Sequence, residues 1–457
     1  EWVNISGANG TTYSSGILAK TTYFRVLVNS NGVLATSGTS LFTMNTLDDM
    51  NYIRVRDILK PQITDPAAAN TLSSSEDVHQ TTQYFDGLGR LVQTVAKQTT
   101  PTNQDLVMQT VYDAAGREVI KYLPYVSTYN DGFYKVNALT DQNTFNAIQF
   151  PGEQYYYGKV DYEPSPLNRV QKTYAPGKYW VGGSRGVSMQ YLINQASDSV
   201  RIWMIAAAQG SIPTTTAMYS AGTLYKTQTT DEQNQSVIDY KDMEGKVVLK
   251  KVQIASAPGT AHIGWLCTYY IYDDLDNLRF VIQPKAIDLV MLNGTWNLST
   301  IPHLTDELCF RYEYDERKRM IIKKVPEAGE VWMVYNGRDE LVMTQDANLR
   351  GQGQWLYTVY DNLDRVLATG IIWDSHDRAY HAGLAATNLT YPNAIYNYAI
   401  LTNPLYDDYS WIPTLPDPFT SSRNTSYDGN FLTPSNVFPF PQVLTQSNCV
   451  RGQVTGM

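Results

Sequence analysis

The sequence predicts an all-β fold built from repeated β-hairpins, with a few short helices. Tyrosine numbers 34 in 457 residues, against 12 phenylalanines and 9 tryptophans. It favours strands because its ring is apolar while its hydroxyl tolerates water. Apolar residues at helical spacing are scarce. In addition, one hairpin-like motif recurs along most of the chain, which is typical of a repeat architecture.

The recurring motif is Tyr-Asp-x-x-Gly-Arg, placed between two runs in which apolar residues alternate. In the stretch TTQYFDGLGRLVQTV it contains Tyr84, Asp86, Gly89 and Arg90. Six further copies, several of them degenerate, contribute Tyr112, Asp113, Gly116 and Arg117, then Tyr240, Asp242 and Gly245, then Tyr272 and Asp273, Tyr314 and Asp315, Tyr335 and Asn336, and Tyr360, Asp361 and Arg365.

Each copy predicts a hairpin turn. The anchor aspartate, replaced once by Asn336, can accept hydrogen bonds from backbone amides two or three residues further on. The third residue after the anchor is Gly or Asp, which tolerate a positive φ. Lys318 departs from this rule, so we expect a different turn type there. We expect the motif residues to cap turns and place charges at strand edges, with no catalytic role.

With these copies in place, the sequence resembles the YD repeats of Rhs proteins, a family that includes the teneurin shells. Residues 163–177, 222–233 and 310–365 resemble bacterial Rhs proteins of the Bacteroidetes kind. In that family the hairpins form a continuous spiral sheet that closes as a hollow shell, and in bacterial members the shell encloses a C-terminal toxin. The resemblance implies that this chain is part of such a shell, with the motif tyrosines packing and lining it.

The same resemblance implies the partners and the location. The expected partner is the protein's own C-terminal toxin or effector domain, which is absent from this sequence. Export through an outer-membrane translocon of the type 9 kind would make the protein secreted or surface-bound. The chain opens without a signal peptide, and its last residues look like the start of another strand, so we expect a fragment of a longer polypeptide.

Three regions are predicted along the chain. Residues 1–45 look like the closing hairpin of an immunoglobulin- or fibronectin-like sandwich, with a turn at residues 29–32, and are expected to be either an incomplete domain or a linker whose strand joins the shell. Residues 46–403 hold the repeats, with a polar connector at 70–77 and helical signals at 284–292 and 305–308. Residues 404–457 contain a proline-rich stretch, expected to be an extended surface loop, and the start of a further repeat.

Composition excludes several function classes. The formal net charge of −9 argues against binding to a nucleic acid backbone. No run of about 18 apolar residues is present, so no transmembrane helix is expected. Three widely separated cysteines give neither a disulfide framework nor a paired zinc site. No phosphate-binding loop or dinucleotide fingerprint occurs, and no cofactor or metal is expected.

Some motifs imitate active sites. Ser184 lies in the sequence GGSRG, which matches a nucleophile elbow, but the residues that follow alternate like a strand, so a hairpin turn is the better interpretation. His376 and His381 lie close to Asp374 and Asp377, at a spacing that fits no zinc-binding helix, and we interpret them as surface polar residues.

Two other groups receive structural interpretations. The acidic run from Asp273 to Asn277 resembles a calcium loop but lacks its glycine and its closing glutamate, and the hairpin turn already explains it. Cys267 and Cys309 lie in apolar strand contexts and are expected to be buried thiols.

Two alternatives to the shell remain open at this stage. An aromatic-rich β-array could serve as a surface adhesin that binds carbohydrate or a neighbouring cell. A hydrolase using Ser184 or the His376 and His381 pair is the second alternative.

Overall fold

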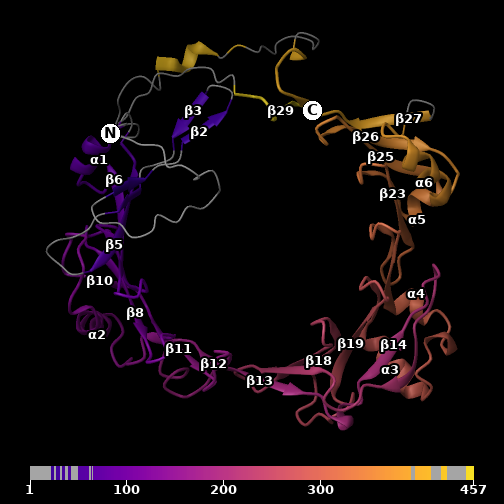
Figure 1. Ribbon diagram of the computed structural model, residues 1–457, viewed down its shortest axis with the longest axis horizontal. Helices are drawn as coiled ribbons and strands as arrows, with labels where there is room; N and C mark the ends of the chain where they lie inside the picture. Colours follow the sequence, from indigo (N-terminus) through magenta and orange to yellow (C-terminus); the bar gives the residue numbers. More distant parts are fainter. Residues whose placement is uncertain are drawn as a thin grey trace. The chain divides into compact units, whose positions relative to one another are not determined.

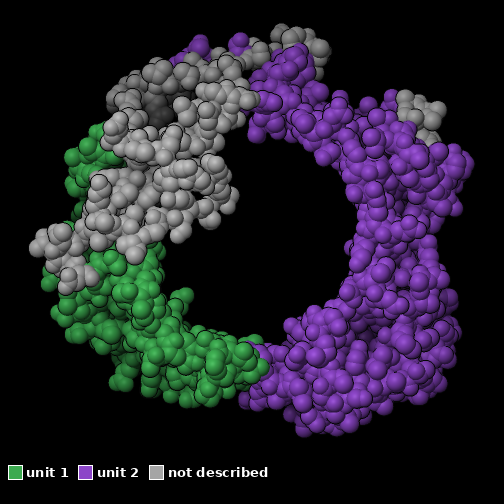
Figure 2. All heavy atoms as spheres, in the orientation of Figure 1, with its two compact units in different colours: residues 1–189 green, residues 190–457 purple. Residues whose placement is uncertain are grey.

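The computed structural model describes residues 50–60, 63, 65–392, 397–412, 422, 424–429 and 449–457, together with the backbone of four short strands before residue 43. The chain divides into two compact units, residues 1–189 and residues 190–457 (Figure 2).

Unit 1 is an antiparallel sheet in which strands that follow one another in the chain lie side by side. Its main strands are β5 (Asn51–Ile58), β6 (Val78–Phe85), β7 (Leu91–Lys97), β8 (Leu106–Tyr112), β9 (Glu118–Tyr122), β11 (Tyr157–Tyr162), β12 (Val170–Tyr174) and the start of β13 (Val187–Ile193). The short strand β10 (Tyr125–Val126) pairs with the beginning of β8. Helix α1 (Pro66–Thr71) follows β5, and α2 (Ala138–Gln149) packs beside β8 and β10.

Four short strands precede β5. They are β1 (Thr22–Phe24), β2 (Leu27–Ser30), β3 (Val33–Thr36) and β4 (Ser40–Phe42). β2 and β3 pair antiparallel with Ser30 opposite Val33, while β4 pairs with both β1 and β5. The turn residues 31 and 32 lie outside the described residues, and the immunoglobulin-like assignment stays a prediction, as do the region boundaries at residues 45 and 403.

Unit 2 continues the same plan over a longer run of strands. They are β16 (Tyr225–Thr230), β17 (Ser236–Lys241), β18 (Val247–Gln253), β19 (Trp265–Tyr272), β20 (Leu278–Ile282), β21 (Cys309–Tyr314), β22 (Met320–Lys324), β23 (Glu330–Tyr335), β24 (Leu341–Gln345), β25 (Gln354–Tyr360), β26 (Val366–Trp373) and β27 (Asn397–Thr402). Each pairs antiparallel with the next. Outside this run lie the two-stranded pairs β14 (Arg201–Met204) with β15 (Thr214–Met218) and β28 (Leu405–Tyr406) with β29 (Val454–Gly456).

Because every strand reverses direction, the connections of the unit 2 sheet alternate between the two ends of its strands. The five predicted aspartate or asparagine turns of this unit, from Asp242 to Asp361, therefore all lie at the same end of the strands. The longer connections lie at the opposite end of the strands. They contain α3 (Pro284–Asn293), α4 (Leu304–Leu308), α5 (Ala347–Gly351) and α6 (Arg378–Thr387). Among the described residues, the short 3₁₀ helices are η1 (Ala196–Asp198), η2 (Leu298–Thr300) and η4 (Thr425–Tyr427).

Helices cover part of the sheet and form its cores (Figure 1). Helix α3 begins at Pro284, is capped at its C-terminal end by Gly294 with φ of +73°, and buries Ile287 and Val290 against β19. Helix α6 packs against β23 and contributes to a second core around Trp355. A third core, in unit 1, surrounds Tyr125.

The predicted all-β fold with few short helices is confirmed. The helical signals at 284–292 and 305–308 correspond to α3 and α4, whereas α1, α2, α5 and α6 were not predicted. In the described part of the chain, no helix has the length and hydropathy needed to span a membrane.

Candidate functional site

The feature that repeats most faithfully is the turn around each anchor residue. The Asp86 amide donates to the Arg90 carbonyl at 2.9 Å, and the Gly89 amide donates back to the Asp86 carbonyl at 3.0 Å. The Asp86 Oδ1 atom accepts the amides of Leu88 and Arg90, both at 2.9 Å. The carboxylate thus bonds the amides two and four residues on. The same four bonds recur at Asp113, Asp242, Asp273, Asp315, Asn336 and Asp361.

The side chain four residues after the anchor closes the turn from outside. The Arg90 Nε atom donates to the Asp86 Oδ2 atom at 2.8 Å, and Arg117, Arg319 and Arg365 bond their own anchors in the same way. The backbone amide and guanidinium of the arginine together hold the pKa of Asp86 below its usual range. These arginines therefore stabilise the turn itself, in addition to placing a charge at the strand edge.

The residue three positions after the anchor has a left-handed backbone in every copy. Gly89 has φ of +77°, Asp364 has φ of +59° and Lys318 has φ of +60°. The expectation of a different turn at Lys318 is wrong, because its amide donates to the Asp315 carbonyl at 2.9 Å as in the other copies. The surrounding hydrogen bonds hold a side-chain-bearing residue in a region that only glycine enters without cost.

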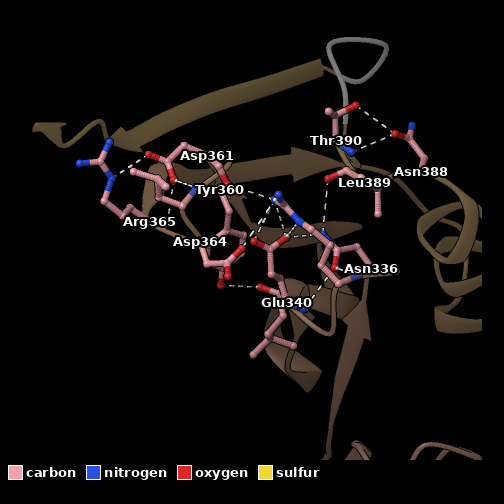
Figure 3. Close-up of polar contacts among 12 residues, drawn as sticks. Asn336, Glu340, Tyr360, Asp361, Asp364, Arg365, Asn388, Leu389 and Thr390 are labelled. Carbon is pink, nitrogen blue, oxygen red and sulfur yellow. Dashed lines mark hydrogen bonds and ion pairs between the residues drawn. The ribbon is translucent and has the colours of Figure 1, made fainter. Parts of the chain in front are cut away.

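In the Asn336 copy the charges are rearranged (Figure 3). Glu340 stands where five of the other copies have Arg or Lys and the Asp273 copy has Asn277, and the Asn336 side-chain amide donates to it. The missing guanidinium comes from Arg338, which bonds Glu340 at 2.9 Å and the Asp361 carbonyl of the next turn at 3.2 Å. The turn geometry therefore survives the reversal of charge.

Neighbouring turns are joined through tyrosines. Where Tyr directly precedes the anchor, its hydroxyl donates to a carbonyl of the turn before it. In each case the acceptor lies five residues after that earlier anchor. These bonds join Tyr112 to Leu91 (2.9 Å), Tyr272 to Val247 (3.3 Å), Tyr314 to Leu278 (3.1 Å), Tyr335 to Met320 (3.0 Å) and Tyr360 to Leu341 (3.0 Å).

Where a turn carries Arg or Lys four residues after its anchor, that side chain also lies over the tyrosine ring of the next turn. The guanidinium carbon of Arg90 is 4.6 Å from the Tyr112 ring centre, and that of Arg319 is 4.9 Å from the Tyr335 ring centre. Such contacts contribute about 0.5–1 kcal/mol at exposed sites. We call the repeated tyrosine hydroxyl bond the cross-turn link; the cation–π contact accompanies it where the preceding turn carries Arg or Lys four residues after its anchor.

Two of the predicted motif tyrosines do not make this link. Tyr84 and Tyr240 lie two residues before their anchors, so they point to the opposite face of the sheet. They are almost fully buried, and the Tyr240 hydroxyl donates to Asp198 at 2.9 Å. Burial raises the pKa of Tyr84 to about 12. The motif tyrosines therefore form two structural classes, one in the cores and one between the turns.

Sequence reasoning missed two related turns. Asp231 accepts the amides of Gln233 and Gln235, each at 2.8 Å, and Asn234 has φ of +64°. This turn lacks both Tyr and Arg, so only Asp with Asn three residues on signalled it. The other turn is anchored by Glu163. Its amide donates to the Arg169 carbonyl at 3.0 Å, and its carboxylate accepts hydrogen bonds from the Arg169 guanidinium. This loop is two residues longer than the others.

A third missed turn is interrupted. The Asp407 amide donates to the Gln453 carbonyl at 3.2 Å, and the Gly452 amide donates to the Asp407 Oδ1 atom at 2.6 Å. The Tyr406 hydroxyl donates to the Val366 carbonyl at 3.0 Å, and Arg365 bonds Asp407 and lies over the Tyr406 ring. Residues 408–451 thus occupy the place of the two residues that other copies have between anchor and left-handed position.

We predict that residues 408–451 can be replaced by Asn-Leu, the dipeptide at residues 362–363, with little change in the melting temperature of unit 2. The shortened segment would restore the spacing of the Asp361 turn, and the bonds of Tyr406 to β26 would remain. Differential scanning calorimetry checks this. The matched control replaces Asp407 by alanine in the shortened chain, which should lower the melting temperature. A large loss of stability on shortening alone would contradict the interrupted-turn assignment.

A second prediction concerns the anchors. Replacing Asp315 by alanine removes hydrogen bonds from the Arg317 and Arg319 amides, each 2.9 Å, and from the Arg319 guanidinium at 2.7 Å. We expect a loss of about 1.5–3 kcal/mol in the free energy of unfolding, measured by urea titration. The control is Glu316→Ala, an exposed residue of the same turn. Equal effects of the two substitutions would mean that the anchor carboxylate is dispensable.

The imitation active sites are placed as follows. Ser184 lies with φ of +54° in a turn between β12 and β13, and its carbonyl accepts Lys172 Nζ. His376 is exposed, but His381 is fully buried, so its interpretation as a surface residue is wrong: α6 turns it toward Trp355 and Tyr391. Within the described ranges, no group of three or more His, Cys, Asp or Glu residues is arranged to hold a metal ion. Cys267 and Cys309 are buried thiols, and burial raises the pKa of each to about 12.

Comparison with known proteins gave one family model and several solved structures. A model described as a domain of unknown function, DUF6443, matches residues 58–193. No curated protein matches the chain. A crystal structure titled TcdB2-TccC3-TEV is 14% identical with a TM-score of 0.47, covering 78% of this chain and 14% of that one. A Photorhabdus luminescens Tc holotoxin pore is 14% identical with a TM-score of 0.43, covering 76% and 15%. This chain thus spans about one seventh of those chains. The Rhs resemblance, with its Bacteroidetes and teneurin aspects, stays a prediction.

Proposed function

We propose that the chain forms part of the wall of a protein shell that sequesters an effector domain of the same polypeptide. The observation that supports this proposal is the cross-turn link. It joins each turn at this end of the strands to the turn before it, from Tyr272 through Tyr406 in unit 2. A sheet whose successive turns are joined in this way is suited to act as a barrier.

The residues that repeat are engaged in this architecture. The anchor carboxylates accept turn amides, and the guanidinium groups bond the anchors and the next tyrosine. A toxin-associated shell, as the sequence resemblance implies, needs continuity and an interior separated from solvent. The proposal therefore assigns the repeated motif to construction of the wall and assigns the effector activity to another segment.

The test uses the natural gene product that contains this chain. Limited proteolysis followed by mass spectrometry should leave the sequestered segment intact for as long as the repeat region is intact. In an Asp315→Ala, Tyr360→Phe double variant, which weakens neighbouring turns, the same segment should be cleaved faster. The matched control is the Glu316→Ala variant. Cleavage of all segments outside the repeats at their free rates in the unmodified protein would reject sequestration.

The proposal includes export, with the protein released or held at the cell surface through an outer-membrane translocon. Fractionation of cells that produce the full protein tests this part separately. Recovery only from the cytosol would reject export while leaving the wall function to be judged by proteolysis.

A further inference from the structure

Unit 2 contains a cavity of about 170 Å³ between the β14–β15 hairpin and the sheet. It lies where β14 packs against β19, next to the turns at Asp242 and Asp273. The residues that matter for its chemistry are Arg201, Trp203, Tyr219, Asp242, Lys246 and Asp273. None of them belongs to a site with an assigned role beyond the turns.

Arg201 is the unusual member of this lining. Among the described residues, no carboxylate lies within ion-pair distance of its guanidinium, whose carbon is 4.2 Å from the centre of the Trp296 ring. Burial lowers its pKa from the usual value, and the only opposing influence is the electrostatic interaction with the Tyr269 phenol. Stacking on Trp296 occupies one face of the guanidinium, whereas its N–H donors lie in the plane of the group and remain available.

A second donor in the lining has no acceptor. The indole Nε1 atom of Trp203 is buried, and no hydrogen-bond partner for it exists among the described residues. A buried donor without a partner costs about 1–3 kcal/mol. Arg201 and Trp203 therefore contribute donors to the lining that have no acceptor among the described residues.

The other charged groups of the lining are already engaged. Asp242 accepts the amides of Glu244 and Lys246, and Asp273 accepts those of Leu275 and Asn277. The Lys246 ammonium is 2.5 Å from Asp276 and 3.7 Å from Asp242. Arg201 is thus the cation without an anion. The two nearby aspartates repel a doubly charged anion more strongly than a singly charged one, because the repulsion scales with charge.

We propose that this cavity binds a small organic acid through a single carboxylate, which the in-plane N–H groups of Arg201 receive. A planar carboxylate matches the guanidinium fork, and the rings of Trp203 and Tyr219 contact the apolar carbons of the acid. This inference goes beyond the wall function and depends on no part of it.

The test is a tryptophan fluorescence titration of the purified chain at low ionic strength, since Trp203 and Trp296 are close to Arg201. The probes are sodium acetate, sodium butyrate, n-butanol and sodium sulfate. Acetate and butyrate should bind saturably, butyrate severalfold more tightly because its chain contacts the rings. Butanol, which has the length of butyrate without its charge, and sulfate should each bind at least tenfold more weakly than butyrate.

Variants decide whether Arg201 is responsible. Arg201→Gln should weaken butyrate binding at least tenfold. Arg185→Gln is the matched control, because Arg185 is also stacked on a tryptophan ring, 4.8 Å from the centre of Trp180, and it should leave the affinity unchanged. If Arg201→Gln fails to fold by circular dichroism, Arg201→Lys decides, with an expected loss of several-fold because an ammonium lacks the planar fork.

Three results would overturn the proposal. They are the absence of saturable butyrate binding to the unmodified chain, equal affinities for butanol or sulfate and butyrate, and unchanged butyrate affinity in a folded Arg201 variant.

Discussion

Replacing Glu313 by glutamine is expected to lower the free energy of unfolding of unit 2 by about 3 kcal/mol or more. Glu313 is almost completely buried and pairs with the equally buried guanidinium of Arg279. Its Oε1 atom also accepts the Gly210 amide at 2.9 Å. Arg279 stands on β20 and bonds the Tyr312 carbonyl of β21 at 3.1 Å. The substitution leaves the Arg279 charge buried with only Asp273, at 3.6 Å, as a distant partner.

Urea unfolding followed by tryptophan fluorescence measures the loss. The matched control is Glu316→Gln, which neutralises an exposed carboxylate three residues away. An Arg279→Met, Glu313→Gln double variant should be less destabilised than the sum of the two single variants, because the unpaired buried charge is gone. Strict additivity of the two single effects would show that the pair is not coupled.

Lowering the pH from 6.5 to 5 is expected to destabilise the protein through two buried histidines. Burial lowers the pKa of His262 to about 3 and that of His381 to about 4, because the imidazolium form is poorly solvated in the cores. In the unfolded chain both return to about 6.5. The unfolded state therefore binds more protons in this window, and stability falls as the pH falls, by up to about 1.4 kcal/mol per pH unit for each histidine.

The window ends at pH 5 because the turn aspartates, whose pKa values are lowered in the folded state, begin to add their own acid sensitivity below it. Chemical unfolding at pH 6.5, 6.0, 5.5 and 5.0 gives the slope. His381→Gln should reduce the slope, although it also lowers the overall stability. His376→Gln, on the exposed neighbouring imidazole, is the control. A slope that His381→Gln leaves unchanged would contradict the assignment.

The turns were predictable from sequence because their bonds are local. The Asp113 carboxylate accepts the backbone amides of Ala115 and Arg117, so the five consecutive residues 113–117 contain all the information that predicts the turn. The Lys318 turn shows the limit of residue preference, since the other hydrogen bonds impose the left-handed backbone there. Asp407 was missed for a different reason: its partners Gly452 and Gln453 are far away in the chain.

The cross-turn link and two of the helices were not predictable. The link depends on the register between neighbouring hairpins, which sets the carbonyl that a hydroxyl such as that of Tyr360 meets. Helix α2 hides Gln142 and Asn146 in its buried face, so hydrophobic periodicity gave no sign of it. His381 was misplaced because the same periodicity did not reveal α6, although Asp377 caps that helix by accepting the Tyr380 amide at 2.9 Å.

The interrupted turn at Asp407 shows how this architecture can acquire new parts. Closure needs the anchor, the left-handed residue and the residue after it, whereas at the Asp86 and Asp361 turns the residue two positions after the anchor is largely exposed. Leu88 and Leu363, at those intermediate positions, are 80% and 72% exposed. Tips with such exposed residues are points where foreign polypeptide can be grafted while the strands on both sides keep their partners, which makes these repeats a scaffold for gaining modules in evolution or by engineering.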